Sequence, residues 1–234
     1  MFFQRVLSIA LVCASPFLMA EDCEYSEWGR DDQIGAANRI TPERTIAAAS
    51  LVKTGASHPL GIVITPGMPA YPPRYTQLQV GQPEHQYRTD ASHKLGWKIS
   101  ANDDLVQMWL GTGPQIDGLG HLGEDGEFYN CHQGKDFAAI TGLTKLDISQ
   151  IPPMVARGVL IDVAKHLGVS HLSAAQPIST QDLQSAMTEQ KITGREGDVI
   201  LLHTGYTDAF LEADPQLWGS TIPGITNDAA RFLA

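Results

Sequence analysis

The hydrophobic and polar positions along the chain change period several times, which predicts strands and helices in turn. Residues 157–163 form an almost uninterrupted apolar run typical of a buried strand, and residues 197–202 form a second one. Between them, Ser179 or Thr180 is placed to cap a helix whose first turn carries Asp182. Strands that alternate with helices indicate an α/β fold.

Local signals predict further elements on both sides of this region. Thr41 followed by Pro42 is typical of a helix N-cap and first helical position, and Gly55 is placed to end that helix. Residues 74–100 are polar and irregular and predict no element. Further strands are predicted at residues 58–64, at residues 105–110 and at Ile116, and a last helix after Thr226 or Asn227.

Composition places the chain among globular proteins and narrows its partners. The chain has 234 residues, of which 43% are hydrophobic and 18% charged, and no repeat or linker divides it, so a single folded domain is expected. The formal net charge is −10. Because phosphate binding needs a basic surface, this charge argues against nucleic acid as a partner.

The first twenty residues predict a secretory signal peptide. Arg5 supplies a positive start, residues 6–12 an apolar stretch, and Ala20 the small residue before cleavage. A buried first helix is the alternative. We therefore expect a mature domain over residues 21–234, exported or periplasmic. Bulky Val12 before Cys13 argues against a lipid anchor, so no membrane attachment is expected after cleavage.

The two cysteines outside this leader are Cys23 and Cys131. In an oxidising compartment they can form a disulfide. Two free, buried thiols are an equally open interpretation.

Residues 103–123 hold the most informative cluster of polar side chains. Gln115 and Asp117 are two residues apart, so on an extended strand both side chains leave the same face. His121 follows in a glycine-flanked turn, where there is room for a ligand. The pattern predicts a small polar site built from a carboxamide, a carboxylate and an imidazole.

Other residues are weaker candidates. His203 follows the second buried strand, where α/β proteins place ligand contacts, although a histidine at a strand end is more often structural. Trp97 could contact an aromatic substrate, or belong to the core. Asp31 and Asp32 could bind a metal, although aspartates in loops more often cap turns.

Several spaced motifs occur together in one order, and the chain resembles the cyclase family of metal-dependent hydrolases. That family includes bacterial kynurenine formamidases and isatin hydrolases. The resemblance implies a swivelling β/β/α domain. The motifs are residues 28–32, 41–43, 103–123, 157–160 and 197–205.

The family signature is His-x-Gly-Thr-His-x-Asp-x-x-x-His, whose first two His and Asp hold a divalent metal. Aligned without gaps, its four key positions are Gly111, Gln115, Asp117 and His121. The resemblance implies zinc or manganese, with Asp117 and Gln115 as ligands, whereas Gly111 has no side chain to offer. The carbonyl oxygen of Gln115 is a weaker ligand than imidazole, so an oxygen-rich site for manganese, magnesium or calcium is the alternative.

The resemblance also implies the reaction. Water attacks the carbonyl of a small amide, lactam or lactone, with His121 as acid and base, as in an arylformamidase. The alternative is a non-catalytic relative that binds a small carbonyl compound after export. The family also implies a homodimer. Relatives generally continue beyond residue 234, so the chain is expected to be incomplete at its C-terminus.

Overall fold

The computed structural model describes residues 23–81 and 102–234. The leader predicted at residues 1–20 and the candidate pocket residue Trp97 lie outside the described residues. Within the described ranges, no helix combines the length and the apolar character needed to cross a membrane.

A pair of parallel strands forms the centre of the larger body. β7 (Gly158–Asp162) pairs with β9 (Val199–His203), and Asp162 lies opposite His203 at their carboxyl ends. Both strands were predicted, and the α/β class is confirmed. The expected burial on both faces is wrong, because Leu160 is 53% exposed while Val159 and Ile161 are buried. Helix α6 (Thr180–Gln190) contacts β7, and its buried side chains join those of Val159 and Ile161 in one core.

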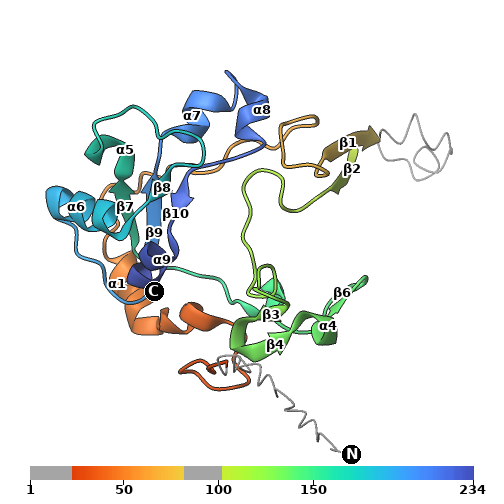
Figure 1. Ribbon diagram of the computed structural model, residues 1–234, viewed down its shortest axis with the longest axis horizontal. Coiled ribbons are helices and arrows are strands. Elements are labelled where there is room, and N and C mark those ends of the chain that lie inside the picture. Colours follow the sequence, from red (N-terminus) through yellow and green to blue (C-terminus); the bar gives the residue numbers. More distant parts are fainter. Residues whose placement is uncertain (1–22, 82–101) are drawn as a thin grey trace, which may run out of the picture.

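Three helices and a second short parallel pair complete this body (Figure 1). The helices are α5 (Val163–His166), α6 (Thr180–Gln190) and α9 (Asn227–Leu233), and the strands are β8 (Pro177–Ile178) and β10 (Gly224–Ile225). Their apolar side chains meet the buried face of β7, and this contact makes the core. The core residues are Val159, Ile161, Val163, Ala164, Leu172, Ile178, Leu183, Ala186 and Ala229.

Helix ends follow the capping signals in the sequence. The predicted cap at the start of α6 is Ser179, and Ser179 and Asp182 form a reciprocal capping box there. Thr41 caps α1 (Pro42–Ala49), and Thr226 caps α9. In each cap the two partners lie three residues apart, so the sequence alone shows which residues can form it.

A β-hairpin extends away from the larger body (Figure 1). It consists of β1 (Thr76–Gly81) and β2 (Asp103–Met108), which pair antiparallel. The predicted strand at residues 105–110 is confirmed in part. Ile116 is not in a strand, because the chain turns after Met108 and finds no further partner.

The prediction of a strand at residues 58–64 is wrong. This segment is irregular, and Leu60 and Val63 are 77% and 82% exposed. A strand needs a neighbour to take up its backbone hydrogen bonds, and none of the described strands pairs with this segment. The apolar pattern alone is therefore not enough to make a strand here.

A third group of short elements follows the candidate site along the chain. It comprises β3 (Glu127–Phe128), η2 (Tyr129–Cys131), β4 (His132–Gln133), α4 (Gly134–Phe137), β5 (Ala138–Ala139) and β6 (Gly142–Leu143). The remaining elements are η1 (Gly35–Arg39), η3 (Ile148–Gln150), α7 (Tyr206–Phe210) and α8 (Pro215–Trp218).

Two contacts fasten the N-terminal segment to this third group. Cys23 and Cys131 form a disulfide, which selects one of the two interpretations left open by the sequence. Buried Asn130 accepts a hydrogen bond from the backbone N–H of Ser26 and donates to the carbonyl oxygens of Gly29, Arg30 and Asp32. The side chain of Asn130 is therefore a second anchor beside the disulfide.

Asp32 belongs to the same anchor. Its carboxylate accepts hydrogen bonds from the Gly35 N–H, from Asn38 and from the Tyr129 hydroxyl. Although burial raises the pKa of Asp32, the hydrogen bonds from Tyr129, Asn38 and Gly35 outweigh burial and lower it below its ordinary value. The carboxylate is a loop cap, as is usual for aspartates at such positions.

Candidate active site

The loop from residue 109 to residue 121 carries the candidate site. It leaves β2 through a turn in which the Thr112 N–H donates to the Trp109 carbonyl. It then packs against residues 143–148, where Gly120 donates its N–H to the Leu146 carbonyl. A Cβ on Gly120 would lie 2.8 Å from Leu143 and 3.1 Å from the Leu146 oxygen. Glycine therefore favours this close approach, since a larger residue would need Leu143 and the Leu146 backbone to shift.

Three of the predicted side chains meet on this loop. The Gln115 amide nitrogen donates to both oxygens of Asp117, at 3.1 and 3.0 Å. The His121 Nε2 lies 3.9 Å from Asp117 Oδ1, within ion-pair range but beyond a direct hydrogen bond. The backbone between them is a loop and not the predicted strand. The expected meeting of the three groups is nevertheless present.

Arg74 reaches the same loop from the segment before β1. Its Nη1 donates to the Gly111 carbonyl oxygen at 2.8 Å. A Cβ built on Gly111 would lie 2.6 Å from this nitrogen and 2.9 Å from Gln115 Oε1. The guanidinium of Arg74 and the amide of Gln115 therefore both lie against Gly111, in the space that a side chain at residue 111 would occupy.

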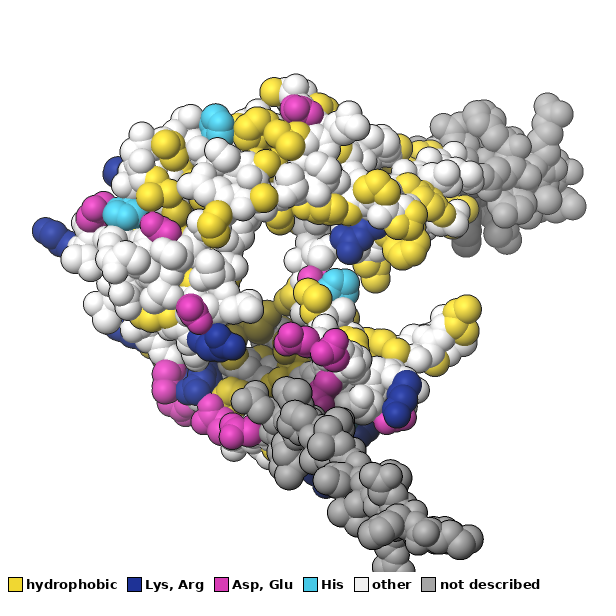
Figure 2. All heavy atoms as spheres, viewed as in Figure 1, with side chains coloured by type: hydrophobic (Ala, Val, Ile, Leu, Met, Phe, Trp, Pro, Cys, Tyr) yellow, Lys and Arg dark blue, Asp and Glu magenta, His cyan; other side chains and the backbone are white. Residues whose placement is uncertain are grey.

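These groups line one cavity of about 800 Å³. Its polar wall includes Arg74, Gln115, Asp117 and His121. Figure 2 shows basic, acidic and histidine side chains at the edge of the hollow between the β1–β2 hairpin and the β3–β4 group. Apolar side chains supply much of the rest of the wall, namely Met108, Trp109, Leu110, Ile116, Leu143, Leu146 and Ile148.

Comparison with known proteins identifies the family. A family model described as "Putative cyclase" matches residues 57–234. The chain belongs to the cyclase family. A solved structure described as a crystal structure of a novel cyclase is 31% identical, with a TM-score of 0.78 over 88% of this chain and 71% of that one. No curated protein matches the chain.

Cyclase-family proteins are generally metal-dependent, but the side chains described here do not fit a resident divalent ion. Gln115 turns its N–H donors, and not its carbonyl oxygen, toward Asp117, so the two side chains do not present oxygens to a common ion. The Arg74 cation borders Gly111, the position that aligns with the first His of the signature. Within residues 23–81 and 102–234, no three His, Cys, Asp or Glu side chains form a group able to hold a metal.

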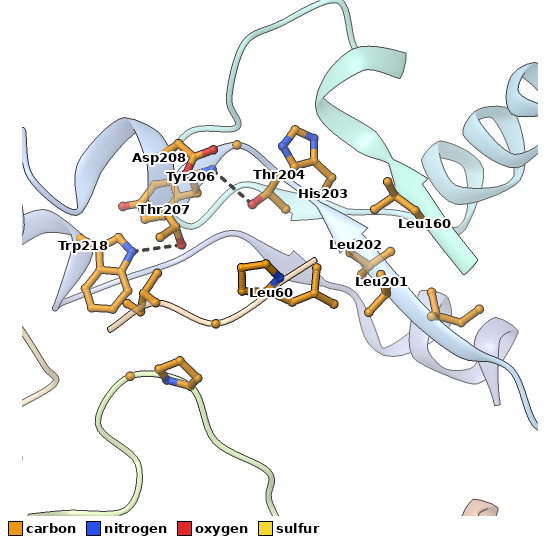
Figure 3. Close-up of a pocket in the computed structure, with 17 residues that line it drawn as sticks. Leu60, Leu160, Leu201, Leu202, His203, Thr204, Tyr206, Thr207, Asp208 and Trp218 are labelled. Carbon is orange, nitrogen blue, oxygen red and sulfur yellow. Dashed lines mark hydrogen bonds between the residues drawn. The ribbon is translucent and has the colours of Figure 1, made fainter. Parts of the chain in front are cut away.

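His203 lies apart from His121 in a second cavity of about 710 Å³ (Figure 3). Its imidazole points away from Leu60 on the opposite wall, and Nδ1 lies 2.8 Å from Asp162 Oδ1. Although burial raises the pKa of Asp162, the hydrogen bond from His203 and other contacts lower it overall. Pairing of β7 with β9 brings these two residues together, so the structure gives His203 a partner at the strand ends.

Arg74 is the cavity residue that sequence reasoning missed. It lies in the segment for which no element was predicted, between a proline-rich loop and the first strand of the hairpin. It is 37 residues before Gly111, and no local pattern links the two. A single arginine in such a segment has no periodic or spacing signal that could single it out.

Proposed function

We propose that this cyclase-family protein hydrolyses a small amide, lactam or lactone. The observation that carries the proposal is the imidazole–carboxylate pair of His121 and Asp117, which lines a cavity of substrate size. Such a pair is a common arrangement for a general base and the group that orients it.

The orientation of the His121 ring indicates which nitrogen accepts and donates the proton in the proposed reaction. Its Nε2 faces Asp117, so Nδ1 is the ring nitrogen left to take a proton from water. Water oxygen then bonds to the carbonyl carbon as the π electrons of the carbonyl move to its oxygen, and the Asp117 carboxylate faces the positive charge that the ring gains. When the carbonyl re-forms and the carbon–nitrogen or carbon–oxygen bond of the substrate breaks, the leaving atom takes the proton from Nδ1 and the ring is neutral again.

Gln115 acts as a positioning residue in this proposal. Its amide holds both Asp117 oxygens, which fixes the carboxylate beside His121. The proposed reaction uses no step at a metal ion.

The setting of the enzyme is also proposed. The chain is exported through the leader at residues 1–20, and the Cys23–Cys131 disulfide supports an oxidising compartment. The likeness to a solved cyclase supports the swivelling β/β/α domain as the finer description of the fold.

The proposed function is tested by measuring hydrolysis of three compounds: formanilide, isatin and δ-valerolactone. We expect His121→Ala to lower kcat/KM at least 100-fold, because a general base contributes 10²- to 10⁴-fold. Free energy of unfolding should change little, since the side chain is well exposed. His166→Ala is the matched control, because this histidine pairs with Glu189 outside both cavities. Equal turnover by His121→Ala and the wild-type protein would contradict the proposal.

A non-catalytic binding protein is the second candidate. It is favoured by Gly111 and Gln115, which replace the first two histidines of the family signature. This candidate predicts saturable binding of a carbonyl compound with no product release by the wild-type protein. The same compounds distinguish the two functions when binding calorimetry is combined with product analysis.

A further inference from the structure

We propose that Arg74 makes this cavity selective for small carbonyl compounds that carry a carboxylate. The inference rests on the proposed function in taking the ligand to be a substrate of the same cavity. It adds a substrate class and a residue that selects it.

Arg74 retains hydrogen-bonding capacity for a ligand. A guanidinium has five N–H donors, and in the described residues the side chain of Arg74 makes one hydrogen bond, to the Gly111 carbonyl. No carboxylate among those residues forms an ion pair with it. Other arginines of the chain do have acidic partners: Arg39 and Arg44 pair with Glu196, Arg157 with Asp198, and Arg231 with Asp228.

The position of Arg74 suits a ligand that spans the cavity. The Oε1 atom of Gln115 lies against Gly111, as does the Arg74 guanidinium, and the Nε2 atom of Gln115 donates hydrogen bonds to Asp117. The guanidinium and the His121–Asp117 pair therefore lie on the two sides of one amide group. A small molecule can place its carboxylate at Arg74 and its carbonyl group at His121.

The acidic side chains in the cavity make a cation necessary for binding an anionic ligand. Asp117 and Asp147 also line the wall, and both would repel an anion. Asp147 accepts hydrogen bonds from Ser149 and Gln150, which lower its pKa below the ordinary value although burial acts in the opposite direction. With these two acids and a net charge of −10, an anionic ligand needs a cation at the point of contact.

The body of the ligand is expected to be apolar and flat. Trp109, Met108 and Leu110 line the wall near the end of β2, and Leu143 and Leu146 line the side against which the loop packs. Such a wall favours an aromatic ring between the carboxylate and the reacting carbonyl.

A pair of nearly isosteric formamides tests this selectivity. 2-Formamidobenzoate carries a carboxylate, and 2-formamidobenzamide carries a neutral carboxamide in its place. Calorimetric dissociation constants of both compounds are measured with the wild-type sequence and four variants, each carrying His121→Ala so that the proposed hydrolysis does not consume the ligand. The variants are Arg74→Gln, Arg74→Lys, Gly111→Ala and Arg231→Gln.

The wild-type protein is expected to bind the carboxylate ten- to a hundredfold more tightly than the carboxamide, since hydrogen bonds to charged groups are the stronger kind. Arg74→Gln should bring this ratio close to one, and Arg74→Lys should restore part of it. Gly111→Ala places a methyl group against the guanidinium and should also lower the ratio, although net charge is unchanged. Arg231→Gln removes an exposed charge outside the cavity and should leave the ratio unchanged.

Two results would overturn the inference. One is a wild-type protein that shows equal affinity, or none, for the two compounds. The other is an Arg74→Gln variant that weakens both equally, because this would mean a general loss of the cavity. Formate release is followed separately with the proteins that keep His121. Carboxylate preference without formate release keeps the inference and contradicts the proposed hydrolysis.

Discussion

Loss of the Cys23–Cys131 disulfide should strongly destabilise the protein. The bond joins residues 108 positions apart, and it connects the N-terminal segment to the turn at η2. A cross-link over so long a stretch removes many conformations from the unfolded chain. Replacement of both cysteines by serine restores those conformations to the unfolded chain, which lowers the free energy of unfolding.

The magnitude follows from the loop length. For a closed loop of 108 residues, the chain-entropy relation gives about 4.8 kcal/mol at 25 °C. The four hydrogen bonds of Asn130 keep the same two segments together in the folded state. We therefore expect the variant to fold, with a free energy of unfolding lower by about 2–5 kcal/mol.

Urea unfolding followed by circular dichroism measures this difference. The oxidised protein is compared with the same protein in dithiothreitol and with the Cys23→Ser/Cys131→Ser double variant. The reduced protein and the variant should agree, and the variant should not respond to dithiothreitol. Free energies of unfolding that agree within about 0.5 kcal/mol in all three samples would refute the chain-entropy reasoning.

Two further predictions concern acid stability and assembly. Arg157 lowers the pKa of Asp198, and Ser179 lowers that of Asp182, below the ordinary value of 3.8. The stability from these carboxylates is present above the unfolded pKa and is lost as pH falls through the folded one, so the thermal midpoint should decrease as pH falls below about 4. We also expect a homodimer, because Leu78 and Val106 face each other across the hairpin and are 45% and 52% exposed. In sedimentation velocity the wild-type protein should have the mass of a dimer and Val106→Asp the mass of a monomer. Equal masses for the two proteins would contradict this prediction.

Elements with local signals could be predicted from the sequence. The capping box of Ser179 and Asp182 and the Thr41 cap involve neighbours within three residues, so the sequence contains all their partners. The apolar segment at residues 58–64 was predicted as a strand and is irregular, because a strand depends on a neighbour that local sequence does not contain. Leu160 shows the same limit, since its exposure depends on which face the helices cover.

The candidate site divides in the same way. By itself, the sequence determined that Gln115, Asp117 and His121 would meet, because short spacing and flanking glycines bring them together whether the backbone is strand or loop. Only the tertiary structure brought Arg74 to Gly111, paired Cys23 with Cys131 and placed His203 in another cavity beside Asp162. These contacts join residues 37 to 108 positions apart, and packing of the whole chain decides which distant segments become neighbours.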